Sequence, residues 1–276
     1  MSKGTVPILK WAGGKRQLMP EIIKKIPENY NCYYEPFLGG AAVLLNLKPK
    51  EAIVNDLNKE LINVYRVVKK YPDKLLEFLQ IHEINHSEEY YYQIRAMDRE
   101  PNYSKLSPIE KAARIIYLNH TCYNGLYRVN RDGYFNTPIG KYKNPNILNK
   151  NNILEVSKYF NDSSIKFSVG DYKKILKDVE KDDFVYLDPP YDPLTDSASF
   201  TMYTKEGFGK NNQKELKKVC DYINKKGAKF LQSNSDTEYI RELYKDYKIV
   251  EISASRMINS KAKGRAKIKE VLISNY

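Results

Sequence analysis

The sequence predicts an α/β fold: a mostly parallel sheet with an antiparallel hairpin at its edge, and a mainly helical insertion. Strand patterns alternate with helical patterns in the first and last parts of the chain, as is typical of a parallel sheet. The last two strand patterns, at 248–253 and 268–274, have no helix between them and therefore predict a hairpin. Residues 57–160 contain no convincing strand pattern and are expected to be helical.

The elements of the predicted sheet begin with a βαβ unit. A strand pattern at 32–37 (CYYEPF) is followed by a glycine turn, a helix-favouring stretch at 41–47 and a second strand at 51–55. Asp56 ends that strand and can cap the helix that starts near Leu57. Further strands are predicted at 164–169, 183–187 and 228–232, and helices at 171–179, 211–226 and 236–246.

The predicted insertion changes character along its length. Ser107 and Glu110 form a capping box with a proline at the first helical position, and apolar residues at helical spacing follow. From 119 to 150 the chain is polar, aromatic and basic, and rich in Asn, Gly and Pro. We therefore expect a catalytic domain formed by 1–56 and 161–276, and an insertion formed by 57–160. With 276 residues and 42% hydrophobic content, one domain with a large insertion fits better than two full domains.

The net charge of +12 is concentrated in three segments. Residues 1–25 carry a net +5, residues 119–150 a net +4 and residues 256–269 a net +6. A lysine-rich composition can also reflect codon usage, so the total charge alone decides little. Three basic segments that fold together would form a phosphate-binding face.

Several classes of protein are disfavoured by composition. No apolar stretch is long enough for a signal peptide or a membrane span, so we expect a cytoplasmic protein. The three cysteines are far apart and form no CxxC pair, and the three histidines show no metal-ligand spacing. These patterns predict neither a disulfide framework nor a metal site.

The most specific motif is LDPPY, at 187–191. The preceding residues form a short apolar run suited to a buried parallel strand, so Asp188 is expected at that strand's carboxyl end. In open α/β sheets this edge binds ligands. Pro189 and Pro190 remove two backbone donors and fix two φ angles, which makes the backbone after Asp188 stiff.

This motif suits chemistry on an exocyclic aromatic amine, which is a poor nucleophile because its lone pair is delocalised into the ring. The Asp188 carboxylate and the Pro189 carbonyl could each accept one N–H and stabilise the positive charge that develops during attack. Tyr191 could stack on the ring. The structural alternative is a proline-rich turn with a core tyrosine.

The glycine turn gives a weaker signal. Phe37-Leu38-Gly39-Gly40 between a strand and a helix allows a ligand to approach the backbone closely, and Asp56 could accept bonds from ribose hydroxyls. The same pattern is also explained by a tight turn and a helix cap. Neither GxGxxG nor GxxxxGK[ST] occurs, which argues against NAD and ATP.

Five motifs together resemble one family. KWAGGK (10–15), EPFLGG (35–40), ND (55–56), GDY (170–172) and DPPY (188–191), in this order, resemble the Dam-type S-adenosylmethionine-dependent DNA adenine-N6 methyltransferases over nearly the whole chain. DPPY alone is shared with methyltransferases that act on RNA or protein glutamine, but KWAGGK and the insertion narrow the choice. The resemblance implies a Rossmann-like methyltransferase sheet and a helical target-recognition insertion.

The resemblance also implies site residues. Asp188, Pro189 and Tyr191 would be catalytic, Asp56 would hold the cofactor ribose, and Asp171 would hold the adenine amino group of the cofactor. The full cofactor-binding set implied is Trp11, Lys15, Phe37, Gly39, Gly40, Asp56, Asp171 and Asp188, with S-adenosyl-L-methionine as methyl donor and no metal.

CYNGLYR (122–128) and FNTPIGKYKNP (135–145) look like the segment with which this family reads GATC in double-stranded DNA. An arginine fork suits guanine O6 and N7, and the target adenine must leave the stack to reach a methyl donor.

The resemblance implies these individual DNA contacts. Lys10 and Tyr142 would read the first guanine, Leu126 and Pro138 would contact the thymine methyl, and Arg128 would contact a guanine of the fourth pair. Tyr123 and Asn124 would lie at the space left by the flipped adenine. Arg265 and Lys267 would bind phosphates, although a solvated hairpin loop explains them nearly as well. Three positions depart from the family pattern: Ala41 in the glycine turn, and Ile139 and Lys141 in the insertion.

The expected function is N6 methylation of adenine in double-stranded DNA, with GATC as the site. The alternatives are an amino-methyltransferase acting on RNA or a protein amide, and a catalytically silent DNA-binding regulator. A monomeric protein is consistent with these expectations. The sequence leaves open whether a partner restriction endonuclease exists, as in a restriction-modification system.

Overall fold

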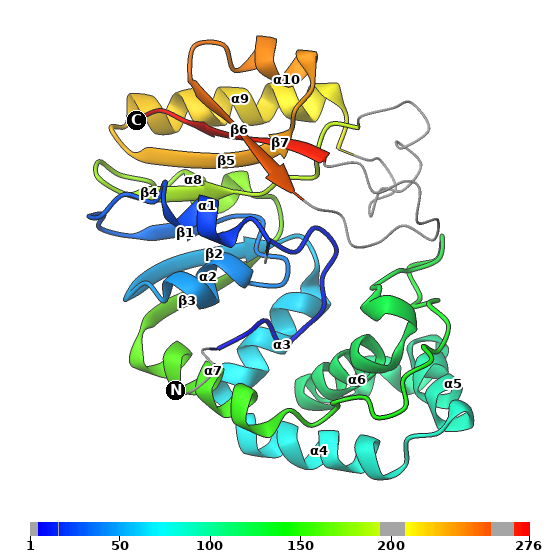
Figure 1. The fold of residues 1–276 in the computed structure, drawn as a ribbon. Coiled ribbons are helices and arrows are strands. Elements are labelled where there is room, and N and C mark those ends of the chain that lie inside the picture. The colour runs from blue at the N-terminus through cyan, green and yellow to red at the C-terminus, as the bar shows by residue number, and fades with distance from the viewer. Residues whose placement is uncertain (1–4, 16, 194–207, 255–267) are drawn as a thin grey trace. The chain divides into compact units, whose positions relative to one another are not determined.

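The computed structural model describes residues 5–15, 17–193, 208–254 and 268–276 (Figure 1). The chain divides into two compact units. The helical unit is Met1–Gly14, Leu38–Lys50 and Asp56–Gly170, and the sheet unit is Lys15–Phe37, Glu51–Asn55 and Asp171–Tyr276. The functional boundaries predicted above remain a prediction, because compactness and function need not divide a chain at the same residues.

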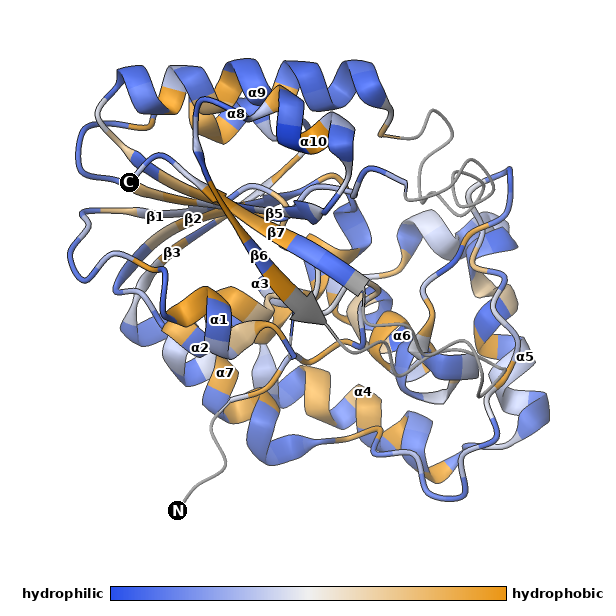
Figure 2. Cartoon of the chain, turned by 45° about the horizontal axis from the view of Figure 1, so that its top comes forward, coloured by the Kyte–Doolittle hydropathy of each residue, from blue (hydrophilic) through white to orange (hydrophobic). Residues whose placement is uncertain are grey.

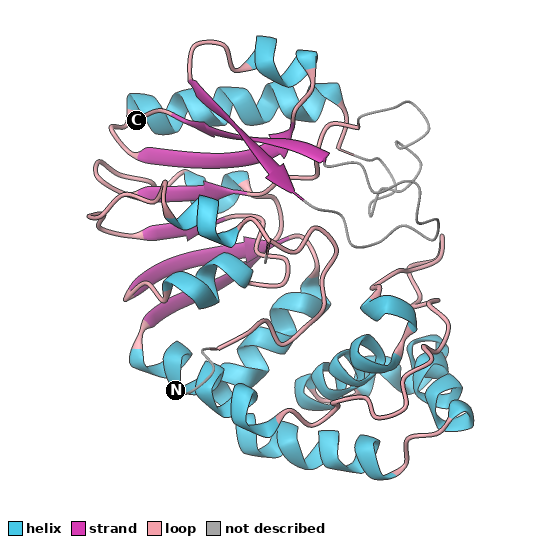
Figure 3. Cartoon of the chain, in the orientation of Figure 1, coloured by secondary structure: helices cyan, strands magenta, loops and turns pink. Residues whose placement is uncertain are grey.

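The strands form a seven-stranded sheet in the order β3-β2-β1-β4-β5-β7-β6 (Figure 3). β1 is parallel to β2 and β4, and β4 is parallel to β5, whereas β7 is antiparallel to both β5 and β6. The predicted mostly parallel sheet with an antiparallel edge hairpin is therefore confirmed. The strands are β1 (Tyr33–Glu35), β2 (Glu51–Asp56), β3 (Ser164–Val169), β4 (Phe184–Leu187), β5 (Lys229–Ser235), β6 (Lys248–Ala254) and β7 (Ile268–Ser274).

The core of the sheet unit lies between the strands and three helices, α8 (Lys173–Leu176), α9 (Lys210–Lys225) and α10 (Glu238–Leu243). On α9, Leu216, Cys220 and Ile223 recur at helical spacing and pack with strand residues in one buried cluster. The rest of α9 is mainly hydrophilic (Figure 2). This amphipathic pattern is the reason why α9 lies along the sheet. A short helix, α1 (Met19–Ile23), also belongs to this unit.

Two helices of the sheet unit are shorter than predicted. The prediction of a helix at 171–179 was too long, because α8 covers only Lys173–Leu176, and α10 covers Glu238–Leu243 instead of 236–246. The Asp171 carboxylate accepts the backbone N–H of Lys173, and the Thr237 hydroxyl accepts that of Ile240. The Thr237 bond is the N-cap of α10, whereas Asp171 lies one residue before Tyr172, the N-cap residue of α8, which makes no side-chain cap.

The helical unit is organised around α6 (Pro108–Thr121), which packs against α3 (Lys59–Lys70), α4 (Pro72–Ile84) and α5 (Glu88–Ala96). Its last ten residues are all buried. The other described elements of this unit are α2 (Ala42–Leu47), α7 (Lys150–Asp162), strand β3 and three 3₁₀ turns, η1 (Met97–Arg99), η2 (Pro101–Lys105) and η3 (Tyr123–Gly125). The helical character predicted for 57–160 is confirmed. No helix in the described part of the chain has the length and apolarity needed to cross a membrane.

The glycine turn before α2 has a backbone that favours glycine at two positions. Gly39 has φ +48°, and Ala41, which departs from the family pattern, has φ +56°. A left-handed backbone brings the alanine Cβ close to the following carbonyl, which costs about 1 to 2 kcal/mol. Ala41 therefore adopts a backbone conformation that a glycine would adopt without this cost.

The capping box at the start of α6 generates a stability prediction. The Ser107 hydroxyl accepts the Glu110 N–H at 3.2 Å, and the Glu110 carboxylate accepts the Ser107 N–H at 2.9 Å. Ser107→Ala should lower the free energy of unfolding by about 1 kcal/mol, measured by urea denaturation, because it leaves an orphan donor at the helix end. Ser104→Ala, at an exposed serine in the preceding turn, is the control and should change it little. Equal effects of the two substitutions would contradict the role of the cap.

Candidate active site and DNA interface

Asp188 follows β4 directly, at the edge of the sheet where the parallel strands end. All four residues of β4 are buried, which matches the apolar run that predicted the strand. The Asp188 side chain retains 22% exposure, while Pro189 beside it is buried. The backbone therefore turns from a rigid buried strand into a rigid proline pair at the carboxylate. Such a position can present Asp188 to a ligand without being able to move it far.

Both oxygens of Asp188 have a partner in the sheet unit. The Ser233 hydroxyl, near the end of β5, donates to Oδ1 at 2.9 Å, and the buried Lys15 ammonium lies 2.7 Å from Oδ2. Tyr186 Oη lies 3.3 Å from the same Ser233 oxygen. An ionised carboxylate offers about four acceptor positions. Asp188 is thus fixed in orientation and retains acceptor capacity for an incoming N–H group.

Tyr191 lies close to the same ion pair. The Lys15 Nζ is 4.9 Å from the centre of the Tyr191 ring, and the Tyr191 hydroxyl donates to Glu270 on β7 at 2.8 Å. Burial, together with the negative charges of Asp188 and Glu270, raises the pKa of Tyr191 well above its usual value. The phenol therefore stays protonated at neutral pH and keeps its bond to Glu270. The structure brings together three predicted residues: Lys15, Asp188 and Tyr191.

Two further predicted cofactor residues have aromatic surroundings in the sheet unit. The Phe37 ring packs against Tyr172 at 4.9 Å between ring centres, and edge-on against Phe208 at 6.1 Å. Asp171 precedes Tyr172 and is exposed, with one carboxylate oxygen accepting the Lys173 N–H at 2.8 Å. The remaining acceptor positions of Asp171 are available to a polar ligand.

Trp11, Gly39, Gly40 and Asp56 form a second group, within the helical unit. A Cβ atom at either glycine would come within 3.1 Å of the Trp11 side chain. The Asp56 carboxylate accepts the N–H groups of Gly39 and Asn58, each at 2.9 Å. Burial raises the pKa of Asp56, and these backbone bonds act in the opposite direction. Because Gly39 and Gly40 have no side chains, they leave the space that the Trp11 side chain occupies. The Asp56 carboxylate is held beside the glycine turn, an arrangement that suits nucleoside binding.

The predicted pair Lys10 and Tyr142 is brought together in the helical unit. Lys10 is anchored by its backbone, whose N–H donates to Asn119 at 2.7 Å and whose carbonyl accepts from Asn119 at 2.8 Å. Its ammonium lies 4.4 Å from the centre of the exposed Tyr142 ring. A Cβ atom at Gly125 would be 2.4 Å from the Lys10 side chain. Gly125 therefore leaves the space that the Lys10 side chain occupies.

The other predicted DNA contacts in the described part of the chain lie in the loop region that follows α6, at residues 122–145. Tyr123 is 56% exposed and donates its N–H to the Pro138 carbonyl at 2.9 Å, while Asn124 has a left-handed φ of +55°. Leu126 is half-buried. The exposed Arg128 guanidinium donates Nε–H to the Asn136 side chain at 2.7 Å and Nη2–H to the Asn136 carbonyl at 3.2 Å, so the fork is oriented and its remaining N–H groups are available for recognition. Arg265 and Lys267 lie outside the described residues.

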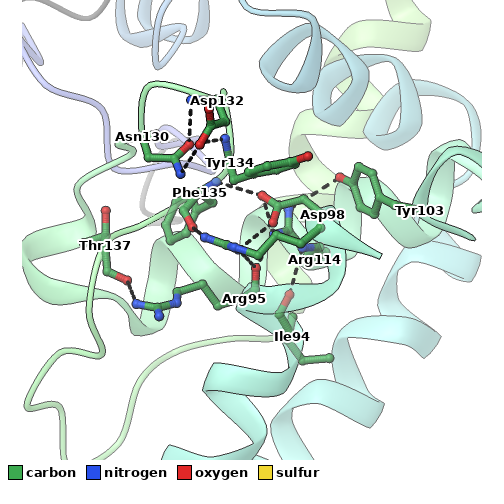
Figure 4. A network of polar contacts seen from close by, with 11 residues as sticks. Ile94, Arg95, Asp98, Tyr103, Arg114, Asn130, Asp132, Tyr134, Phe135 and Thr137 are labelled. Atoms are coloured by element: carbon green, nitrogen blue, oxygen red, sulfur yellow. Dashed lines mark hydrogen bonds and ion pairs between the residues drawn. The ribbon is translucent and has the colours of Figure 1, made fainter. Parts of the chain in front are cut away.

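An ionic network around the buried Arg114 supports this loop region (Figure 4). Asp98 accepts the Phe135 N–H at 2.7 Å and pairs with the buried Arg114 at 2.9 Å. Arg99 pairs with Asp98 at 2.7 Å and donates to the Phe135 carbonyl at 2.9 Å. A bridge between Val129 and Phe135 closes a small hairpin there. The network thus fixes both peptide groups of Phe135, at the base of the hairpin.

Sequence reasoning missed several of these supporting residues. Ser233 was missed because the strand predicted at 228–232 ends before it, whereas β5 extends to Ser235. Asp98 and Arg114 gave no sequence signal of a contact. Two charged residues that are far apart in the sequence are ordinarily interpreted as two separate solvated side chains. No group of His, Cys, Asp or Glu placed to hold a metal was found within the described ranges.

Comparison with known proteins gives a consistent result. The family described as D12 class N6 adenine-specific DNA methyltransferase matches residues 11–258. The chain is 45% identical to the type II methyltransferase M1.LlaDCHI of Lactococcus lactis subsp. cremoris, covering 98% of this chain and 95% of that protein. It is 40% identical to the type II methyltransferase M.MjaIII of Methanocaldococcus jannaschii, with 98% and 99% covered. It is also 35% identical to a DNA adenine methylase of Haemophilus influenzae, with 96% and 92% covered.

These matches confirm the Dam-type resemblance and favour DNA adenine over RNA or a protein amide as the substrate. The chain belongs to the family of D12 class N6 adenine-specific DNA methyltransferases.

Proposed function

We propose that this DNA adenine-N6 methyltransferase acts on GATC in double-stranded DNA, flips the target adenine and uses S-adenosyl-L-methionine as methyl donor. One observation carries the chemistry: the Asp188 carboxylate is held by Ser233 and Lys15 at the end of β4, next to a buried proline. The GATC site rests on the resemblance of the 122–128 and 135–145 segments to the family's reading loop.

The residues of the chain fit this cofactor. Asp56 would accept the ribose hydroxyls and Asp171 the adenine amino group, and both carboxylates are already oriented by backbone N–H groups. When bound, S-adenosyl-L-methionine supplies a methyl group on a positively charged sulfur. We assign cofactor binding to Trp11, Lys15, Phe37, Gly39, Gly40, Asp56, Asp171 and Asp188.

The reaction depends on how the target amine is held. Asp188 and the Pro189 carbonyl each accept one N–H, which favours a pyramidal nitrogen whose lone pair points out of the ring plane. The same two oxygens stabilise the positive charge that develops on the nitrogen, and the proton leaves after attack. Tyr191 stacks on the flipped base and sets its height. No step assigned to these residues needs a metal.

DNA recognition is assigned to the loop region after α6. Lys10 and Tyr142 would read the first guanine, Leu126 and Pro138 the thymine methyl, and Arg128 a guanine of the fourth pair. Tyr123 and Asn124, both exposed, would border the space left by the flipped adenine. Residues 57–160 would then act as the recognition insertion of a catalytic domain formed by 1–56 and 161–276. Arg265 and Lys267 are proposed to bind phosphates.

Plasmid protection tests the recognition site. Plasmid from Dam-deficient cells expressing this chain should resist an endonuclease that is blocked by adenine methylation in GATC, and sequencing with modified bases called should place N6-methyladenine in GATC alone. Plasmid from cells that lack the gene is the control. Modified adenine in another motif would refute the GATC assignment and leave the family chemistry intact.

Asp188→Ala tests the catalytic assignment. The substitution removes an acceptor of the target amine, so methyl transfer should fall by at least about 100-fold. Binding of S-adenosyl-L-methionine, measured by calorimetry, should weaken but remain measurable, because the other residues assigned to the cofactor, among them Asp56 and Asp171, are unchanged. Turnover close to that of the wild type would be incompatible with the role proposed for Asp188.

Arg128→Ala tests base reading. Loss of a bidentate contact to guanine should cost about 1 to 3 kcal/mol of discrimination at one base pair and leave the other positions unchanged. The measurement is kcat/KM on duplexes with single substitutions in GATC. Arg131→Ala, at a second exposed arginine of the same loop region, is the charge-matched control and should leave selectivity as in the wild type. Unchanged selectivity in Arg128→Ala would remove this contact from the proposal.

A further inference from the structure

The peptide groups on both sides of Tyr191 are held by two buried side chains. The carbonyl of Pro190, which precedes the tyrosine, accepts from Gln213 Nε2 at 3.0 Å. The N–H of Asp192, which follows it, donates to Asn234 Oδ1 at 3.0 Å. The two holding side chains also bond each other, since Asn234 Nδ2 donates to Gln213 Oε1 at 3.2 Å.

Gln213 lies in the first turn of α9 and is completely buried. It occupies the face of α9 on which Leu216, Cys220 and Ile223 pack into the core. A buried amide on an apolar face costs free energy unless its groups are hydrogen-bonded. Its donor and its acceptor are both used, one on the Pro190 carbonyl and one on Asn234. The glutamine is therefore committed to the loop after β4.

Asn234 lies in β5, directly after the Ser233 that bonds Asp188, and is also completely buried. Its Oδ1 accepts a second bond, from the Ser235 N–H at 2.9 Å, which fixes the orientation of its amide. Asp192 is held further by the Thr237 hydroxyl, which donates to its carboxylate at 2.8 Å. The loop at residues 190–192 is thus hydrogen-bonded by side chains of three elements: Asn234 of β5, Thr237 at the start of α10 and Gln213 of α9.

We propose that Gln213 and Asn234 are positioning residues that fix the backbone on both sides of Tyr191 and so set the height and tilt of its ring in the site. The inference rests on the proposed stacking of Tyr191 on the target base. The ring is then held at three places: its preceding carbonyl, its following N–H, and its hydroxyl on Glu270. A side chain held in this way needs no reorganisation when a flipped base arrives.

Gln213→Met tests the proposal, because it keeps a similar volume and removes the donor to Pro190. The value of kcat should fall by about 10- to 100-fold, as expected when a reacting group is misplaced by a fraction of an ångström to an ångström, and KM for DNA should change by only a few-fold. Asn234→Asp is the second variant, since it keeps the acceptor for Asp192 and loses the donor to Gln213. It should show the same pattern if Gln213→Met folds poorly.

Gln232→Met is the matched control. Gln232 is equally buried and lies in the same strand as Asn234, but it bonds Tyr244 and Cys220 instead of the loop after β4. Its substitution should lower the thermal midpoint by a similar amount and leave kcat within a few-fold of wild type. An equal loss of kcat in Gln232→Met would mean that general destabilisation explains the effect, and would overturn the proposal.

A double-mutant cycle with Tyr191→Ala separates this proposal from the proposed function. If Gln213 acts through Tyr191, Gln213→Met should lower kcat in the wild-type background and cause little further loss in Tyr191→Ala. Full additivity of the two losses would overturn the positioning role. If Tyr191→Ala alone left kcat unchanged, the proposed role of Tyr191 would fail first, whatever Gln213 does.

Discussion

The arrangement of the residues that follow β4 depends on one constraint: Ser233 and Lys15 each bind one oxygen of the Asp188 carboxylate. A hydroxyl on a neighbouring parallel strand and a buried ammonium each bind one oxygen of the carboxylate. The strand order makes this possible, because β5 pairs with β4 and ends beside it, so that Ser233 lies close to the first residue after β4. A carboxylate fixed in this way can point its remaining acceptor positions at one place, which a free aspartate on a loop could not do.

The proline pair extends the same constraint along the backbone. Pro189 and Pro190 restrict φ but do not by themselves fix the direction of their carbonyls, so a hydrogen bond is needed to fix the orientation of the next peptide. Gln213 supplies that bond at Pro190, and Asn234 does so on the far side of Tyr191. The prolines of the motif thus make its backbone stiff, whereas side chains on α9 and β5 fix the orientation of its peptide groups.

The difference between local constraints and contacts to distant residues explains how much could be predicted from the sequence. The strands, their mostly parallel order and the position of Asp188 followed from local patterns, since apolar runs and prolines act on their immediate neighbours. Ser233, Gln213 and Asn234 are polar residues in buried positions, and their value depends on partners that are 45, 23 and 42 residues away in the chain. The Asp98 and Arg114 pair has the same character, because the burial of Arg114 is what makes the pair informative and burial is a property of the folded chain. The start of α10 was mispredicted for a local reason, because the Thr237 cap and not helix propensity decides where that helix begins.

The Lys15 ion pair also limits what charge alone can contribute at Asp188. With an ammonium 2.7 Å from one oxygen, much of the field of the carboxylate is cancelled at a distance, so its effect on a developing positive charge is strong only within hydrogen-bonding contact. Acceptor direction then matters more than net negative charge. A site of this kind depends on the orientation of its carbonyl, carboxylate and aromatic ring, which is why buried amides that touch neither substrate nor cofactor should matter for turnover. The same ammonium lies 4.9 Å from the Tyr191 ring centre, so Lys15 connects the carboxylate and the ring that are proposed to act together on one base.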